Sequence, residues 1–417
     1  MLSSFRYKPV YKISVWIMAG ILFILTFLMI SNKDSPFLNA GDSVNYWAAG
    51  QLMLNGDNPY LSENVLNLRY IAGNFKEFPQ NAIFQIMYPP WAMTLLLPLG
   101  IFDFTVSSIL WLIIHVSVII FSANRIWKIY NGPQDKKYIL YLATVFFAPT
   151  FIVLVMGHFT TLHLLGLVGF LYFLQNSNNE PNKEFAAGFC AAIVLIKPQL
   201  LYLFLIALLI WSMHHRRWKI ILGGMTFIFT TSFISIVLNP LIFNQYVEAF
   251  ASYSLGVWAT PTLGTVLRAF SLNLISKDIE WLQVLPILFG LAWLIFYYRK
   301  HHKTWDWVEE LPLVILVSFV TCPYMWTYDM IVLLIPVISL TIKLIEQPNR
   351  IIMGIFGIIF LAMNLSTIIL HRFYDDFWFV WYAPGILVLY LIGSRISSTN
   401  QLVGTIPGES QSPAASQ

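Results

Sequence analysis

A few charged side chains lie beside or inside long apolar segments of this sequence. Asp42 opens a short polar and aromatic run, and Asp329 lies within an apolar block. Lys197 separates two apolar blocks, and Arg268 lies in a long loop. A charge in apolar surroundings is costly unless it is paired or faces water, so such residues are candidates for chemistry.

Asp42 fits two roles. It directly precedes a segment that we expect to form a short helix at the membrane surface, so its carboxylate could cap that helix by accepting backbone N–H bonds. Alternatively, a carboxylate fixed at the hydrocarbon boundary could act as a general base that removes a proton from an acceptor hydroxyl. The two roles are compatible, because a capping carboxylate can also face a cavity.

The other three charges also have a chemical and a structural interpretation. Lys197 and Arg268 suit a phosphate group, the lysine as a point charge and the arginine through two parallel hydrogen bonds. As structural residues they would be anchors that reach the membrane interface. Asp329 needs a partner or an aqueous cavity, and we weigh pairing with a histidine or arginine equally with sugar binding.

The elements that position these residues are transmembrane helices. Of the 417 residues, 58% are hydrophobic and only 11% are charged, well below the charged share of soluble domains. The apolar residues fall in blocks close to the ~20 residues that cross a bilayer. We therefore predict an all-α polytopic membrane protein with about 12 transmembrane helices, or about 13 if the short segment 89–102 is counted.

The distribution of Lys and Arg predicts the orientation and the domain limits. Basic residues near the segment ends place the N-terminus and the C-terminal tail in the cytoplasm and the two long loops, 32–88 and 239–280, on the outer face. Residues 1–393 would form one transmembrane catalytic domain with an outer juxtamembrane helix. The tail 394–417 is rich in Ser, Gly, Gln and Pro and is predicted to be disordered.

A set of motifs extends along most of the chain in a fixed order. It comprises Asp42, Tyr46, Ala48, Gly56 and Pro59-Tyr60, then Tyr88-Pro89-Pro90 with Leu95-Leu96-Leu97-Pro98, then Gly157, Lys197-Pro198-Gln199, Pro323-Tyr324, Tyr328-Asp329 and Leu333-Leu334. In this order the motifs resemble glycosyltransferase family 87, the polyprenyl-phosphate-mannose-dependent mannosyltransferase-like group of the GT-C superfamily. The sequence departs from the family pattern at His158, where glutamine is common, and at Tyr328-Asp329, where some members carry histidine.

The resemblance implies an inverting glycosyltransferase in a plasma or cytoplasmic membrane, with its active site on the non-cytoplasmic face. Its donor would be a hexose, with mannose favoured, on a polyprenyl phosphate, and its acceptor a lipid or a glycan. The catalytic base of the family corresponds to Asp42, and we assign the donor phosphate to Lys197 and Arg268. The substrate-binding candidates are Tyr46, Tyr60, Tyr88, His158, Gln199, Tyr328 and Asp329.

Other classes of function are less well supported by the sequence. The net charge of +4 comes from short loops without a basic groove, so nucleic acid is not an expected partner. His158 and His163 are five residues apart and lack a metal-binding motif, so we expect hydrogen bonding and assign no metal or cofactor. A transporter or lipid flippase is the main alternative, although transporters usually show two related halves with broken helices at the midplane.

The orientation can be tested with fusion reporters. Because basic residues favour the cytoplasmic side, a reporter fused after Asn74 should lie outside the cytoplasm and one fused at Ser397 inside. Reporters that respond to the compartment would give this result. If both lay on the same side, the orientation and the side of the active site would be wrong.

Overall fold

The computed structural model describes Gly20 and residues 41–73, 86–177, 180–252, 258–271, 279–347 and 350–404. The structure is 81% helical, and the described residues contain no strand. The first apolar segment, 13–31, lies outside the described residues apart from Gly20. The all-helical prediction is therefore confirmed for the part of the chain that the structure describes.

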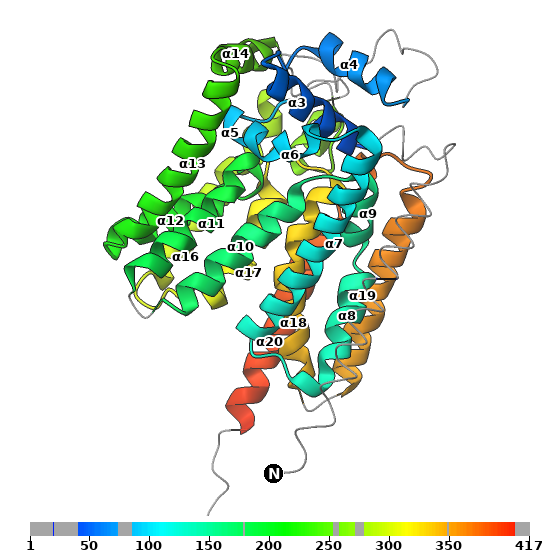
Figure 1. Ribbon diagram of the computed structural model, residues 1–417. Helices are drawn as coiled ribbons and strands as arrows, with labels where there is room; N and C mark the ends of the chain where they lie inside the picture. Colours follow the sequence, from blue (N-terminus) through cyan, green and yellow to red (C-terminus); the bar gives the residue numbers. More distant parts are fainter. Residues whose placement is uncertain are drawn as a thin grey trace, which may run out of the picture.

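The helices and 3-10 helices (η) follow one another in this order: α3 (Ser43–Asn55), α4 (Ser62–Ile71), α5 (Pro90–Met93), η1 (Thr94–Leu96), α6 (Leu97–Gly100), α7 (Phe104–Ile129), η2 (Gln134–Lys136), α8 (Lys137–Val145), α9 (Ala148–Met156), α10 (Thr160–Gln175), α11 (Pro181–Ala192), η3 (Ile193–Ile196), η4 (Pro198–Leu200), α12 (Tyr202–His214), α13 (Trp218–Leu238), α14 (Ile242–Ser252), α15 (Leu263–Phe270), α16 (Trp281–His301), α17 (Trp307–Thr321), η7 (Thr327–Leu333), α18 (Leu334–Ile345), α19 (Arg350–Leu370), η8 (Asp376–Phe379) and α20 (Tyr382–Gly404). Figure 1 shows the long helices as a bundle, with α3, α4, α5 and α14 gathered at one end, which we call the α3 end.

The described residues contain 6 helices long and apolar enough to cross a membrane, or up to 7 if α8 and α9 are one span bent by 54°. The count of about 12 is thus not confirmed. Several predicted spans are too short for the ~30 Å hydrocarbon core at 1.5 Å per residue: α10 and α12 contain 16 and 13 residues. The segment 89–102, predicted to be a partial element, is divided into α5, η1 and α6.

The predicted helix after Asp42 exists as α3, and most of its side chains are buried within the protein. Residues on all its sides, including Val44, Trp47, Ala48 and Met53, are buried. The reason is a layer of short helices packed around it. A Cβ at Gly50 would lie 2.5 Å from the carbonyl oxygen of Leu96 and 2.8 Å from the backbone nitrogen of Gly100, so only glycine allows α3 to approach η1 and α6 so closely.

Hydrogen bonds from side chains to main-chain carbonyls join this layer to the bundle. Trp91 of α5 donates to the carbonyl of Leu195 at 2.8 Å. Thr94 donates to the carbonyl of Thr231 at 2.7 Å. The layer therefore has a defined position on the bundle, because hydrogen bonds are directional.

The last helix extends beyond the predicted domain limit at residue 393. Helix α20 continues to Gly404, so residues 394–404 are helical where the sequence predicted a disordered tail. Part of the reason is a buried contact in which Gln347 donates to the hydroxyl of Ser397 at 2.9 Å. Residues 405–417 lie outside the described residues.

Two glycines allow α11 and α13 to cross in close contact. A Cβ at Gly188 would lie 1.9 Å from the carbonyl oxygen of Ile220, and one at Gly223 would lie 2.0 Å from that of Phe185. These neighbours are backbone atoms, which cannot turn aside as a flexible side chain could. Small residues of this kind let membrane helices pack backbone to backbone.

We predict that Gly188→Ala lowers the free energy of unfolding by about 1–3 kcal/mol, because the added methyl group forces α11 and α13 apart. Thermal unfolding of the purified protein would measure the loss. The matched control is Gly357→Ala on α19, where nothing lies within 4 Å of the added Cβ. That variant should be as stable as the wild type or slightly more stable, since alanine favours helix. Equal stability of all three proteins would contradict the prediction.

Candidate functional site

The beginning of α3 is fixed against the turn between α9 and α10. The backbone N–H of Asp42 donates to the carbonyl of Met156 at 2.9 Å. Gly157 has φ +61°, and a Cβ there would lie 2.7 Å from the Cβ of Ser43. A side chain at position 157 would therefore displace Asp42, and the glycine is required both by its conformation and by this contact.

The carboxylate of Asp42 does not cap the helix. Asp42 occupies the N-cap position of α3, but its side chain makes no capping hydrogen bond, so the capping interpretation is wrong for the carboxylate. The side chain accepts a hydrogen bond from Tyr328 instead. It is partly exposed. The carboxylate is therefore available for chemistry, with one neighbouring phenol that orients it.

Burial and charge act in opposite directions on Asp42. Burial raises the pKa of the carboxyl from 3.8 to about 6, and nearby Asp329 adds to the increase. Lys197, the hydrogen bond from Tyr328 and the charge of Arg69 lower the pKa. The result is a carboxyl group that is mostly ionised at neutral pH and remains a stronger base than an exposed aspartate.

Lys197 lies at the break between η3 and η4, as the proline after it predicts. Its ammonium donates to Asp329 at 2.5 Å, and the two side chains are only 3% and 0% exposed. The rings of Tyr324 and Tyr328 lie 5.5 Å from the ammonium nitrogen. Lys197 is therefore held in place by a buried ion pair and two aromatic faces.

Asp329 uses both carboxylate oxygens. One accepts from the hydroxyl of Thr160 at 2.8 Å, and the other accepts from the backbone N–H of Trp326 at 2.8 Å as well as from Lys197. The predicted need for a partner is met by a lysine. The imidazole Nδ1 of His158 lies 3.8 Å from the carboxylate and is only a neighbour of it.

A chain of hydrogen bonds links the aromatic candidates. The hydroxyl of Tyr88 lies 3.0 Å from the imidazole Nε2 of His158 and 3.1 Å from the hydroxyl of Tyr46. Tyr60 donates to the main-chain carbonyl of Tyr88 at 2.9 Å. His158 also stacks on Tyr328, with ring centroids 4.1 Å apart. Tyr46, Tyr60, Tyr88, Tyr328 and His158 thus form one connected aromatic and polar group, which we call the aromatic wall.

Two predicted site residues lie apart from this group. Arg268, on α15, donates to Gln283 at 3.0 Å in a buried cluster of its own. That cluster meets the site where Gln283 donates to the carbonyl of Pro323, next to Tyr324. Gln199 lies in η4, two residues after Lys197, and is half-buried.

Sequence reasoning missed Arg69 and Thr160. Arg69 on α4 is 1% exposed and acts electrostatically on Asp42. Nothing in the local sequence marks it, because a single arginine in a polar loop is ordinarily exposed. Thr160, which directly follows His158-Phe159, bonds both His158 and Asp329, and only the folded chain brings these groups together.

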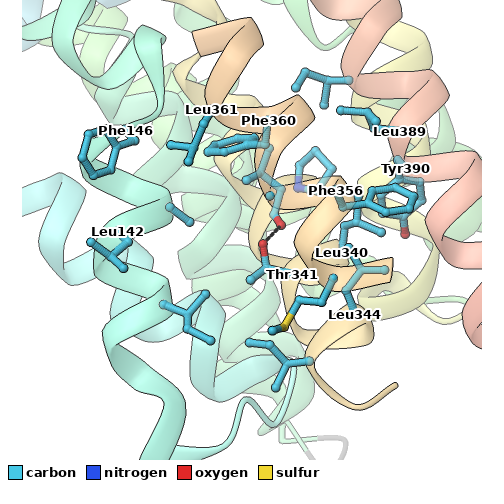
Figure 2. Close-up of a pocket in the computed structure, with 18 residues that line it drawn as sticks. Leu142, Phe146, Leu340, Thr341, Leu344, Phe356, Phe360, Leu361, Leu389 and Tyr390 are labelled. Carbon is cyan, nitrogen blue, oxygen red and sulfur yellow. Dashed lines mark hydrogen bonds between the residues drawn. The ribbon is translucent and has the colours of Figure 1, made fainter. Parts of the chain in front are cut away.

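The described residues contain no group of three or more His, Cys, Asp or Glu side chains that could hold a metal ion. In the same residues, a cavity of about 240 Å³ lies between α8, α18, α19 and α20. It is lined almost entirely by apolar side chains such as Leu142, Phe146, Leu340 and Phe360, as Figure 2 shows. The phenol of Tyr390 is the one ionisable group among the described residues that line this cavity, so the cavity is a poorer candidate for an active site than the surroundings of Asp42.

Apolar helices long enough to span a bilayer, together with buried acid, base and hydroxyl groups near one end, describe a membrane-embedded enzyme. The sequence profile of glycosyltransferase family 87 matches residues 86–323, more than half of the chain. The chain therefore belongs to glycosyltransferase family 87 and is a membrane glycosyltransferase, as the motifs predicted. The comparisons with curated proteins and with solved structures give no match.

The pair Lys197–Asp329 can be tested by a double-mutant cycle. Lys197→Met should lower the free energy of unfolding by about 3–5 kcal/mol, because it leaves a buried carboxylate without its cation. Adding Asp329→Asn should restore most of the loss, as measured by thermal unfolding. Lys183→Met removes a partner from the exposed pair Lys183–Glu180 and should cost at most about 1 kcal/mol. A stable single variant Lys197→Met would show that the ion pair does not hold the fold.

Proposed function

We propose that this family 87 glycosyltransferase transfers a hexose, with mannose favoured, from a polyprenyl phosphate to a lipid or glycan acceptor. The transfer takes place on the outer face of the membrane and inverts the anomeric centre. The observation that carries the proposal is the carboxylate of Asp42, which stands at a helix start without capping it. A base needs a carboxylate that is not bound to the backbone and lies within reach of its substrate.

In the proposed reaction, Asp42 removes the proton of the acceptor hydroxyl as its oxygen forms a bond to the anomeric carbon. The bond between that carbon and the phosphate oxygen breaks, and its electron pair leaves with the polyprenyl phosphate. Attack from the face opposite the phosphate inverts the configuration. No covalent intermediate forms on the protein, so a single carboxylate is sufficient.

Lys197 is the proposed cation for the donor phosphate, because it is the lysine whose charge acts on Asp42. Its ion pair with Asp329 already fixes the ammonium, so little side-chain conformational entropy is lost when the phosphate binds. Arg268 is the proposed second cation. This role is supported by the hydrogen bond from Gln283, the partner of Arg268, to the carbonyl of Pro323. The next residue, Tyr324, places its ring against the ammonium of Lys197.

The remaining candidates are proposed to bind the sugar. Tyr46, Tyr88 and His158 present hydroxyl and imidazole groups in one hydrogen-bonded chain, and such groups suit sugar hydroxyls. Tyr60 and Tyr328 add their rings to the aromatic wall, Asp329 pairs with Lys197, and Gln199 follows Lys197 by two residues. Family membership favours this transferase over the alternative of a transporter.

Asp42→Asn tests the proposed base. It should lower the maximal transfer rate by about 10²–10⁴-fold and leave the KM for the donor almost unchanged, because the base acts mainly in the transition state. Purified protein in lipid nanodiscs with radiolabelled polyprenyl-phosphate mannose would give both constants. The control is Asp57→Asn, an exposed aspartate in the same loop that should keep the wild-type rate.

Two results would contradict the proposal. An Asp42→Asn enzyme with a normal maximal rate and a raised KM would assign Asp42 to donor binding. If the wild type transfers sugar from nucleotide donors and ignores lipid-linked ones, the proposed donor is wrong whatever the role of Asp42.

A further inference from the structure

Arg69 is among the most completely buried charged side chains that the structure describes. It lies in the last turn of α4, a short helix of mixed composition that packs on α3, and it is 1% exposed. Burying a guanidinium is costly unless anionic or polar groups surround it. Its position therefore needs an explanation, and the sequence motifs do not provide one.

The guanidinium is directed at the first turn of α3. Arg69 donates to the side-chain oxygen of Asn45 at 2.5 Å. Asn45 lies three residues after Asp42, and residues at this spacing are neighbours on a helix surface. Arg69 and Asp42 attract each other, because the guanidinium lowers the pKa of Asp42 and the carboxylate raises the pKa of Arg69. The amide of Asn45 thus anchors a cation beside the proposed base.

Asp42 faces charged and titratable groups from several elements. Lys197 approaches from the break between η3 and η4, Tyr328 and Asp329 from η7, Tyr46 from α3 itself and Arg69 from α4. Lys197 is already engaged by Asp329 at 2.5 Å. Arg69 brings a second cation, anchored on the amide of Asn45, toward the same carboxylate.

We propose that Arg69 is a positioning residue for Asp42 and that its guanidinium keeps the carboxylate ionised for proton removal at neutral pH. The inference rests on the proposed role of Asp42 as general base. It explains the buried arginine and gives the short helix α4 a purpose. It also separates the two cations by task, with Lys197 for the donor phosphate and Arg69 for the base.

The expected effect is a displaced pH profile. Burial raises the pKa of Asp42 to about 6, and Arg69 opposes the increase. Burial lowers the pKa of Arg69 to about 10, so the guanidinium stays charged at neutral pH. Removing the charge of Arg69 should therefore raise the pKa of the Asp42 carboxyl. The acid limb of kcat/KM, which reports the free enzyme, should move upward accordingly.

The test compares the pH profiles of wild type, Arg69→Gln and Arg69→Lys. In Arg69→Gln the acid midpoint should rise by about half a pH unit or more, so that activity is low at pH 6 and recovers toward the wild-type value at pH 9. Arg69→Lys keeps the charge and should stay near the wild-type midpoint. Arg217→Gln removes an arginine from a distant pair with Glu184 and should not move the midpoint. A structural defect would lower activity equally at every pH.

A second variant and a second measurement keep the inference testable. If Arg69→Gln does not fold, Asn45→Ala removes the anchor but keeps the cation, and its midpoint should rise by a smaller amount. Infrared titration of the Asp42 carboxyl, assigned by the signal lost in Asp42→Asn, reports ionisation without any transfer assay. It therefore remains decisive even if the proposed donor is wrong. An unchanged Asp42 titration in folded Arg69→Gln protein would overturn the inference.

Discussion

The buried ion pair of Lys197 and Asp329 is the constraint on which the rest of the site depends. It joins residues 132 positions apart and holds the helix break at Lys197 against η7. Such a pair costs desolvation energy that its attraction repays only with good geometry and additional hydrogen bonds. Thr160 and the backbone of Trp326 supply those bonds to Asp329. The positions of His158, Tyr328 and hence Asp42 follow from this arrangement.

The charges near the site nearly balance. Asp42 and Asp329 are opposed by Lys197 and Arg69, so an ionised carboxylate can exist in surroundings that would otherwise protonate it. This balance fits a base that must be ionised before the substrate binds but must not be so well stabilised that it cannot accept a proton. Burial raises the proton affinity of Asp42, and the cations limit the increase.

Local sequence patterns predicted the helix after Asp42, the break at Lys197-Pro198 and the need of Asp329 for a partner. They failed where the outcome depends on distant contacts. The burial of α3 follows from the approach of Gly50 and Leu96 across 46 positions, and the partner of Asp329 is far away in the chain. The predicted number of spans is not confirmed in the described residues, because an apolar segment of 13 or 16 residues resembles a span in composition but not in length. The burial of Arg69 was not predicted, because it depends on the packing of α4 against α3 and not on the local sequence.

The hydrogen bonds that fix the α3 layer to the bundle have an unequal distribution of donors and acceptors. In two of them, the donors are the side chains of Trp91 and Thr94, and the acceptors are the main-chain carbonyls of Leu195 and Thr231. Any amino acid offers the same carbonyl. Sequence drift at the accepting positions therefore leaves these bonds intact as long as the helix path is kept. Distant homologues can thus share this joint while aligned residues on its accepting side show little identity, and searches for them should weight the donor residues.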